Sequence, residues 1–255
     1  MKQIYKIFLG VIASFPLLTG CEDDLPVYTN PNCGLKFEYE YDRDSVYSYS
    51  FAFEDETVVQ DTVWFDVRLV GDLKDYDRPI ALSQVMTGKN DAVAGEHYVP
   101  FDDPGLASKL IMPANAIDTK LPVVVKKGGV LKGDDMADVT LKVTFKVNEA
   151  FVYAVKERDQ RGILIANYLI QPNNWDTYCN HFFGAYSRVK HQAMIDATGF
   201  KWDNEFVDVT VAYYFEDQNV ITSWVQKVNV WLAEYEAEHG EPLRDENGNI
   251  VTMGM

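Results

Sequence analysis

Apolar and polar residues alternate along much of the chain between residues 35 and 147. Such runs, separated by clusters of Gly, Pro, Asn and Asp, predict half-buried antiparallel strands, because successive side chains of a strand face opposite ways. The predicted strands cover residues 35–41, 47–53, 63–69, 80–86, 106–112, 121–126 and 139–147. Residues 162–170 are apolar without clear alternation and predict either a further strand or a buried connector.

This number of short strands in a stretch of roughly 115 residues is typical of an antiparallel β-sandwich of immunoglobulin-like size. We therefore assign residues 34–170 to a β-sandwich domain. The chain as a whole is expected to be mainly β with some α, since its pattern changes after residue 170.

Residues 171–255 are expected to form a helical C-terminal region. Between residues 182 and 197 apolar side chains recur every three or four residues, and Gly199 lies where a helix would end. A second such stripe runs from residue 225 to 235 and is closed by Gly240, whereas residues 207–215 fit either a helix or a strand. Asn247-Gly248 lies between two short segments near the end and predicts a tight hairpin.

The N-terminus has the order of an export signal. Lys2 and Lys6 are followed by an uncharged run, residues 7–18, which is shorter than the roughly 20 residues that a membrane-spanning helix needs. The next residues resemble the bacterial lipobox at all four positions, Leu18, Thr19, Gly20 and Cys21. We therefore expect residues 1–20 to be a signal peptide and Cys21 to be lipidated; the alternative is an ordinary thiol after a conventional signal.

Residues 21–33 are expected to be a tether between the lipid and the folded domain. Two or three acyl chains would anchor it stably, since each buried CH₂ contributes about 0.8 kcal/mol. The acidic run Glu22-Asp23-Asp24 resembles the signal that exports lipoproteins of the Bacteroidota to the outer cell surface, although a solvated linker would look the same. The expected location is the outer membrane, with the protein displayed at the cell surface.

Composition indicates a globular, acidic protein. The chain is 47% hydrophobic and 13% aromatic. Removal of residues 1–20 leaves 235 residues, with 21 Lys and Arg against 39 Asp and Glu, a formal charge of −18. Such a charge repels phosphate backbones and anionic headgroups, which argues against nucleic-acid partners and leaves membrane attachment to the lipid.

Two cysteines remain after Cys21. In an oxidising compartment Cys33 and Cys179 could form a disulfide, closing a long loop; the alternative is two buried free thiols.

No pattern of catalytic or metal-ligating residues emerges from the sequence. The four histidines are scattered, and the chain lacks the G-x-S-x-G, H-E-x-x-H, Walker and G-x-G-x-x-G motifs. Asp245, Asn247 and Asn249 resemble the start of a calcium loop, but Ile250 replaces the required glycine, so a turn is the better interpretation. We expect no enzyme activity, cofactor or metal. A carboxylate pair for glycoside hydrolysis stays an alternative, because it is defined by the distance between the two groups in the fold and not by a sequence pattern.

The aromatic residues suggest a surface for sugars or for a partner protein. Trp175 and Trp202 stand among polar residues and are predicted to be exposed and to contact a ligand, or else to fill a seam between domains. Trp231 lies on an apolar helical stripe and is predicted to be core.

Part of the predicted β-sandwich resembles a known repeat. Residues 91–100, 110–114 and 123–125 resemble the Calx-β repeat, an immunoglobulin-like sandwich, with His97 in place of the usual acidic residue. Some such repeats bind calcium, but their carboxylates are not matched in this chain.

The whole chain resembles a lipoprotein family of the Bacteroidota defined as a domain of unknown function. The matching segments are residues 21–26, 49–53, 67–71, 77–79, 183–187, 189–190 and 242–248. Genes of that family tend to lie beside SusC/SusD-type pairs, in which an outer-membrane transporter and a surface lipoprotein import nutrients. The resemblance implies a non-enzymatic accessory role in nutrient uptake, with the transporter complex or a glycan as partner. The alternatives are a surface glycan-binding lipoprotein and a surface hydrolase.

Overall fold

The structure is a computed structural model that describes residues 32–39, 45–133 and 135–254. The predicted signal peptide, Cys21 and nearly all of the tether lie outside these residues. The chain from Asn32 onwards forms one compact unit. Within the described ranges, no helix combines the length and the apolar character needed to cross a membrane.

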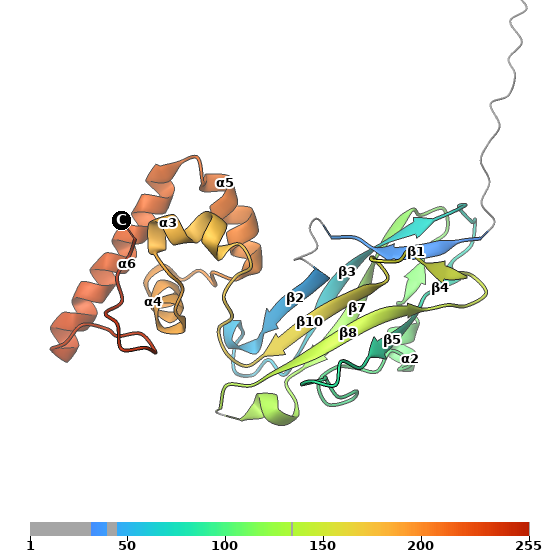
Figure 1. The fold of residues 1–255 in the computed structure, drawn as a ribbon, viewed down its shortest axis with the longest axis horizontal. Coiled ribbons are helices and arrows are strands. Elements are labelled where there is room, and N and C mark those ends of the chain that lie inside the picture. The colour runs from blue at the N-terminus through green and yellow to red at the C-terminus, as the bar shows by residue number, and fades with distance from the viewer. Residues whose placement is uncertain (1–31, 40–44, 134, 255) are drawn as a thin grey trace, which may run out of the picture. The chain divides into compact units, whose positions relative to one another are not determined.

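Two four-stranded sheets form the β region, residues 34–170 (Figure 1). The order of the first sheet is β7 (Asp118–Lys126), β3 (Gln60–Val70), β1 (Gly34–Phe37) and β9 (Tyr153–Ala154). The order of the second is β2 (Val46–Ser50), β10 (Gln160–Ala166), β8 (Asp138–Lys146) and β5 (Ala81–Val85). A separate short pair joins β4 (Arg78–Pro79) to β6 (Ile111–Met112).

The sheets are mixed, so the expectation of purely antiparallel sheets is wrong. β2 pairs with β10 in parallel, with Tyr47 opposite Ile163, and β1 pairs with β9 in parallel. Parallel neighbours need a long crossover between them, and each of these pairs joins strands far apart in the sequence. The mainly β character with added helices is confirmed, whereas the immunoglobulin-like and Calx-β-like assignments stay predictions.

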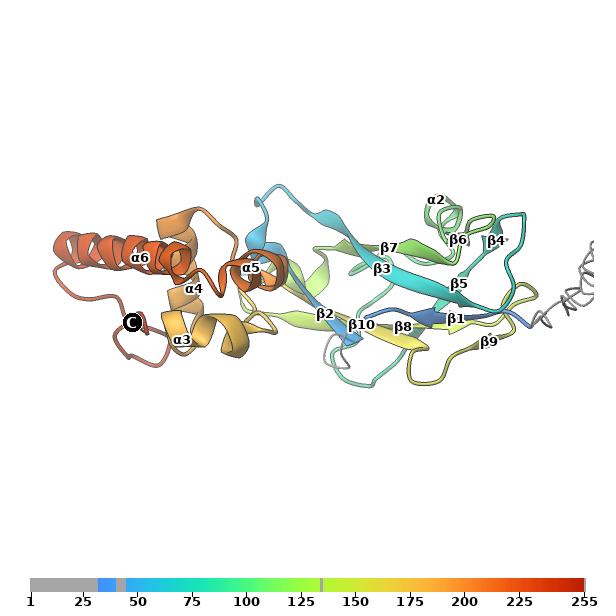
Figure 2. The ribbon, with the colours of Figure 1, turned by 90° about the horizontal axis from the view of Figure 1, so that it is seen from above.

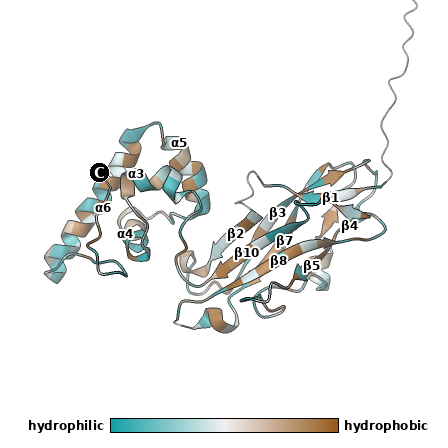
Figure 3. Cartoon of the chain, viewed as in Figure 1, coloured by the Kyte–Doolittle hydropathy of each residue, from teal (hydrophilic) through white to brown (hydrophobic). Residues whose placement is uncertain are grey.

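The two sheets share one hydrophobic core, which explains the alternation in the sequence. In β3 the buried residues Val63, Phe65, Val67 and Leu69 occupy every second position. They pack with buried residues of β8 and β10 in the other sheet. Phe37 of the first sheet stacks on Phe145 of the second, with ring centroids 4.1 Å apart. Figure 3 shows hydrophobic and hydrophilic positions mixed along these strands.

The strand predicted at residues 106–112 is mostly absent. Helix α2 (Pro104–Ala107) occupies its start and only Ile111–Met112 is extended. The carboxylate of Asp103 accepts hydrogen bonds from the N–H groups of Gly105 and Leu106, and Pro104 supplies the fixed φ angle of a first helical residue. This local cap outweighs the apolar pattern.

Other predicted strands are confirmed in outline. β10 shows that the apolar run after residue 160 is a strand, and the predicted strand at 47–53 ends early in a short 3-10 helix, η3 (Phe51–Phe53). A second 3-10 helix, η4 (Gly129–Lys132), follows β7.

The helices of residues 171–254 are drawn in yellow to red in Figure 2. This helical region has its own hydrophobic core. Its elements are η5 (a π-helix, Trp175–Cys179), α3 (Asn180–Phe183), α4 (Arg188–Thr198), η6 (a π-helix, Phe206–Val211), α5 (Ala212–Tyr214) and α6 (Gln218–His239). Gly199 and Gly240 end α4 and α6 in the left-handed conformation, as predicted. Of the ambiguous residues 207–215, residues 207–214 are helical, in η6 and α5.

The predicted C-terminal hairpin is reduced to a turn closed by a single bridge between Arg244 and Ile250. The Asp245 carboxylate accepts hydrogen bonds from the N–H groups of Asn247 and Asn249. These bonds favour the turn interpretation over the calcium-loop one, because they direct the carboxylate to its own backbone.

Candidate functional site

A cavity of about 340 Å³ lies where β2 and β3 meet the segment that follows α4. We call it the Trp64 pocket. Its lining residues are Tyr47, Ser48, Tyr49, Ser50, Phe53, Glu54, Asp61, Thr62, Val63, Trp64, Lys201, Asp203, Asn204 and Glu205. It combines aromatic rings with carboxylate, amide and hydroxyl groups, as small-molecule binding pockets generally do.

The strand alternation of β3 turns Trp64 outward. Its neighbours Val63 and Phe65 are 5% and 0% exposed and point into the core, so Trp64 must point the other way and is 54% exposed. The large ring of Trp64 is therefore accessible at the outer face of the sheet. The sequence carries this signal, because Trp64 stands between two residues of the predicted core face.

Tyr47 of β2 is half-buried beside carboxylates from two parts of the chain. Burial raises the pKa of its hydroxyl, and the negative charges of Asp203, Glu205 and Asp61 raise it further. The hydroxyl therefore stays protonated and available as a donor. These carboxylates come from two segments of the chain, since Asp61 is the second residue of β3 and the other two follow α4.

Asp61 is held in place by two donors. The Tyr49 hydroxyl donates to its Oδ2 atom at 2.9 Å, and the N–H of Thr62 donates to its Oδ1 atom at 2.6 Å. Tyr49 is itself buried, and burial together with this hydrogen bond raises the pKa of its hydroxyl. The carboxylate is thus oriented before any ligand arrives.

The opposite wall, residues 201–205, is attached to the β region by polar contacts. Lys201 pairs with Glu54 at 2.6 Å, and the Asn204 side-chain amide donates to the Ser48 carbonyl at 3.4 Å. The Asp203 Oδ1 atom accepts from the N–H of Phe206 at 2.8 Å, which leaves its Oδ2 atom free of that bond.

Trp202 anchors residues 201–205 in the core of the helical region. Its backbone is left-handed, with φ 54°, and its side chain is fully buried, with the indole N–H donating to Thr198 Oγ1 at 2.8 Å. The ring contacts Phe183 and Trp224 edge-on. Because Trp202 points into the helical core, its neighbours Asp203 and Lys201 can contribute to the pocket.

The predicted exposure of Trp175 and Trp202 is therefore wrong, since both are 0% exposed. Trp175 donates its indole N–H to the Gly184 carbonyl at 3.1 Å. Each indole is satisfied inside the core, so a polar sequence context does not mean an exposed ring. Trp231 shows the reverse error: the pattern predicts a core residue, but Trp231 is partly exposed and lines a groove between α4 and α6.

The predicted disulfide is absent, because Cys33 and Cys179 are both free and buried. Cys33 belongs to the core of the β region and Cys179 to the core of the helical region. Burial raises the pKa of the Cys179 thiol to about 12, which keeps it protonated and unreactive.

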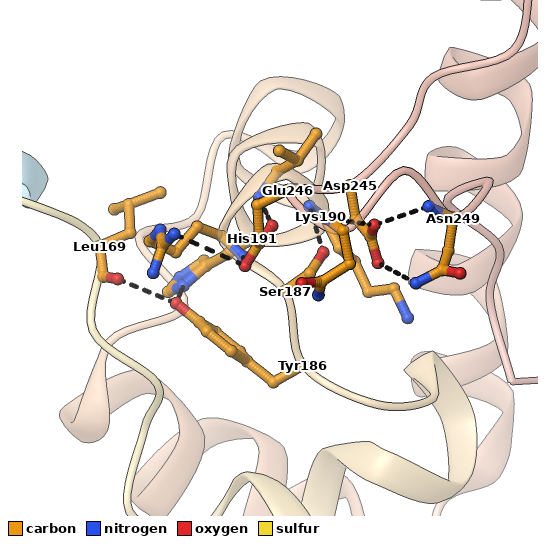
Figure 4. A network of polar contacts seen from close by, with 11 residues as sticks. Leu169, Tyr186, Ser187, Lys190, His191, Asp245, Glu246 and Asn249 are labelled. Carbon is orange, nitrogen blue, oxygen red and sulfur yellow. Dashed lines mark hydrogen bonds and ion pairs between the residues drawn. The ribbon is translucent and has the colours of Figure 1, made fainter.

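The residue run 183–190 and the ending 242–248 meet in one polar network (Figure 4). The Glu246 carboxylate accepts hydrogen bonds from the N–H groups of Arg188 and Val189 at 3.0 and 3.5 Å, and Ser187 caps the same helix through the N–H of Lys190. The end of the chain thus caps the start of α4, where unpaired N–H groups favour a negative charge.

Lys190 and His191 lie buried in this network. The Lys190 ammonium donates to the carbonyls of Phe183 and Ala185 at 2.7 and 2.8 Å, and burial lowers its pKa. The ammonium and the two carbonyls are hydrogen-bond partners of one another, so a structural role explains the buried Lys190.

His191 is fully buried, and burial lowers its pKa to about 4. Its Nε2 atom lies 3.2 Å from the Lys201 carbonyl, which only accepts, so the ring proton is on Nε2. Its Nδ1 atom lies 3.3 Å from the Tyr186 hydroxyl, which donates to the Leu169 carbonyl at 3.0 Å (Figure 4). His191 thus links α4 to the wall of the Trp64 pocket.

Among residues 32–39, 45–133 and 135–254, no group of three or more His, Cys, Asp or Glu side chains is placed to hold a metal ion. The aromatic, hydroxyl and carboxylate groups of the Trp64 pocket suit an organic ligand that carries both apolar and hydroxyl groups.

Comparison with known proteins gives one family, and the solved structures similar to this chain include two distant neighbours from Bacteroides. Residues 28–200 match the family described as a domain of unknown function (DUF4843). A two-domain protein of unknown function from Bacteroides fragilis NCTC 9343 has 12% identity and a TM-score of 0.36; the match covers 52% of this chain and 45% of that one. A structure from Bacteroides ovatus ATCC 8483, described as a "putative carbohydrate binding protein", has 14% identity and a TM-score of 0.31. That match covers 53% of this chain and 37% of the other one. No curated protein matched.

Proposed function

This chain belongs to the DUF4843 family, and we propose that it is a lipid-anchored, non-enzymatic protein that binds a glycan at the Trp64 pocket. The observation that carries the proposal is an exposed tryptophan in the lining of a cavity that also contains carboxylates, one of which, Asp61, is held by two hydrogen bonds.

A sugar ring matches this combination of groups. Its C–H face is apolar and packs on an aromatic ring, while its hydroxyls need hydrogen-bond partners at the rim. Trp64 supplies the ring, Asp61 and Asp203 supply acceptors, and the protonated Tyr47 hydroxyl supplies a donor. Because Asp61 is already held by two hydrogen bonds, little side-chain entropy is lost when a sugar binds.

The proposed location follows from the N-terminal sequence. Lipidation of Cys21 would tether the acidic domain to the outer membrane, and the following Glu22-Asp23-Asp24 favours display at the cell surface. In that position a glycan-binding protein would act as an accessory component of nutrient uptake, beside a SusC/SusD-type transporter. Its negative charge argues against nucleic-acid ligands.

A surface hydrolase is the second candidate, because carboxylates of β3 and of the segment after α4 face the same cavity. A pair of carboxylates is the minimum for glycoside hydrolysis. Product analysis separates the two functions.

The direct test is affinity electrophoresis of residues 22–255 in gels that contain single polysaccharides, followed by chromatography of each glycan after incubation with the protein. Slower migration in at least one gel without new oligosaccharides supports binding. Release of products assigns hydrolysis instead, and unchanged migration in every gel overturns the proposal.

The anchor and the location need separate tests in cells. Cys21→Ser is expected to move the protein from the membrane fraction to the soluble one, and protease added to intact cells is expected to cut the wild type. Membrane retention of C21S would contradict lipid anchoring, and full protection from protease would contradict surface display.

A further inference from the structure

A second cavity, of about 460 Å³, lies along the facing sides of α4 and α6. Its lining residues are Val189, Gln192, Ala193, Asp196, Trp231, Glu234, Tyr235, Glu238, His239 and Leu243. On each helix these positions follow the spacing i, i+3, i+4 and i+7, so one continuous stripe of each helix borders the groove. Neither stripe belongs to the Trp64 pocket.

The groove has an aromatic wall on α6. Trp231 and Tyr235 stack with ring centroids 5.6 Å apart, and Tyr235 stacks on His239 at 4.0 Å. The three rings form a continuous wall along α6, against which aliphatic side chains can pack.

Charge identifies the kind of partner. Asp196, Glu234 and Glu238 line the groove, and no Lys or Arg belongs to its lining. Glu234 and Glu238 also lie near the C-terminus of α6, which ends at His239, where the helix dipole already carries negative potential. Carboxylates there repel the dipole, and a cationic partner would relieve that repulsion.

We propose that this groove docks a basic amphipathic helix of a partner protein. Aliphatic side chains of the partner would pack between Val189 and the ring column, and its Lys or Arg side chains would pair with Asp196, Glu234 and Glu238. Docking of an amphipathic helix into a groove between two helices follows the same i, i+3, i+4, i+7 spacing.

The probe is a synthetic 18-residue peptide with Leu at i, i+3, i+4 and i+7 positions and Lys elsewhere, measured by fluorescence anisotropy against residues 22–255. Two control peptides replace Lys by Glu or scramble the Leu positions. The first peptide is expected to bind at least about tenfold more tightly than either control, with affinity falling as salt rises. Equal binding of the scrambled peptide would reduce the interaction to charge alone and overturn helix docking.

The protein variants are charge reversals at exposed positions. Glu234→Lys with Glu238→Lys is expected to weaken binding of the basic peptide at least about tenfold. The control, Glu216→Lys with Glu236→Lys, makes the same change in net charge outside the groove lining. Circular dichroism checks that both variants are folded. Retained binding by the first variant, or an equal loss in the control, would overturn the proposal.

Discussion

The Lys201 ammonium and the Glu54 carboxylate form an ion pair of 2.6 Å across one side of the Trp64 pocket. Glu54 follows η3 in the β region, and Lys201 follows α4 in the helical region. Since both side chains are partly exposed, the pair contributes at most about 1 kcal/mol to folding. Its importance is positional, because it attaches the segment after α4, which supplies Asp203, to the β region, which supplies Asp61.

Trp202→Ala should destabilise the fold by about 3–5 kcal/mol, because it removes a fully buried ring and leaves a cavity. Trp64→Ala should change stability by no more than about 0.5 kcal/mol, since its ring is largely exposed and packs little. Urea denaturation of both variants measures the difference. Similar midpoints for the two would show that the burial assigned to Trp202 is wrong.

His191 should make the protein less stable in mild acid. Its folded pKa of about 4 lies below the ordinary value of 6.5, so the unfolded chain binds the proton more tightly. The stabilisation is complete above about pH 6.5 and falls by about 3 kcal/mol as the pH drops toward 4.

His191→Gln should therefore lose less stability than the wild type between pH 6.5 and 4, as measured by denaturation at each pH. His239→Gln, at an exposed position, serves as the control and should follow the wild type. Parallel pH curves for the wild type and His191→Gln would contradict a buried neutral imidazole.

Glu246→Ala should destabilise the start of α4 by about 1 kcal/mol, the usual cost of losing a helix cap. Burial alone would raise the pKa of Glu246, but the hydrogen bonds from Arg188 and Val189 and the Arg188 charge outweigh it and hold that pKa below its usual range. Hydrogen exchange at the first turn of α4 is the measurement. Glu241→Ala, at an exposed position, should leave that exchange unchanged.

Cys33 and Cys179 should both react as free thiols. In denaturant without reductant, alkylation of residues 22–255 should add two groups by intact mass, whereas the native protein should add none quickly, because both thiols are buried. A mass without added groups in denaturant would demonstrate the disulfide that the structure lacks.

The period-two pattern predicts most of the strands because one face of each strand is buried in a shared core, as in β3. It fails at residues 106–112, where the Asp103 cap and Pro104 decide the local structure. It also cannot give the parallel pairing of β2 with β10, since pairing partners are set by the topology.

Candidate site residues are harder to predict than strands. The polar neighbours of Trp202 predict a surface position, yet a left-handed backbone turns it into the core. Trp64 is the better candidate, because both of its neighbours in β3, Val63 and Phe65, are buried. Its side chain must therefore lie on the outer face of the strand. The meeting of Asp61 with Asp203 and Glu205 around Tyr47 joins segments far apart in the chain, which no local pattern reveals.

The most direct test of glycan binding at the Trp64 pocket is isothermal titration of a glycan that slows migration in the gels into the wild type, Trp64→Ala and Tyr213→Ala. Tyr213 is 78% exposed and does not line the Trp64 pocket, so its loss controls for removal of an exposed aromatic ring. We expect Trp64→Ala to weaken binding about fivefold or more, since stacking of a ring is worth about 1 kcal/mol or more in such sites, and Tyr213→Ala to bind as the wild type does. Unchanged affinity in Trp64→Ala would contradict glycan binding at this pocket.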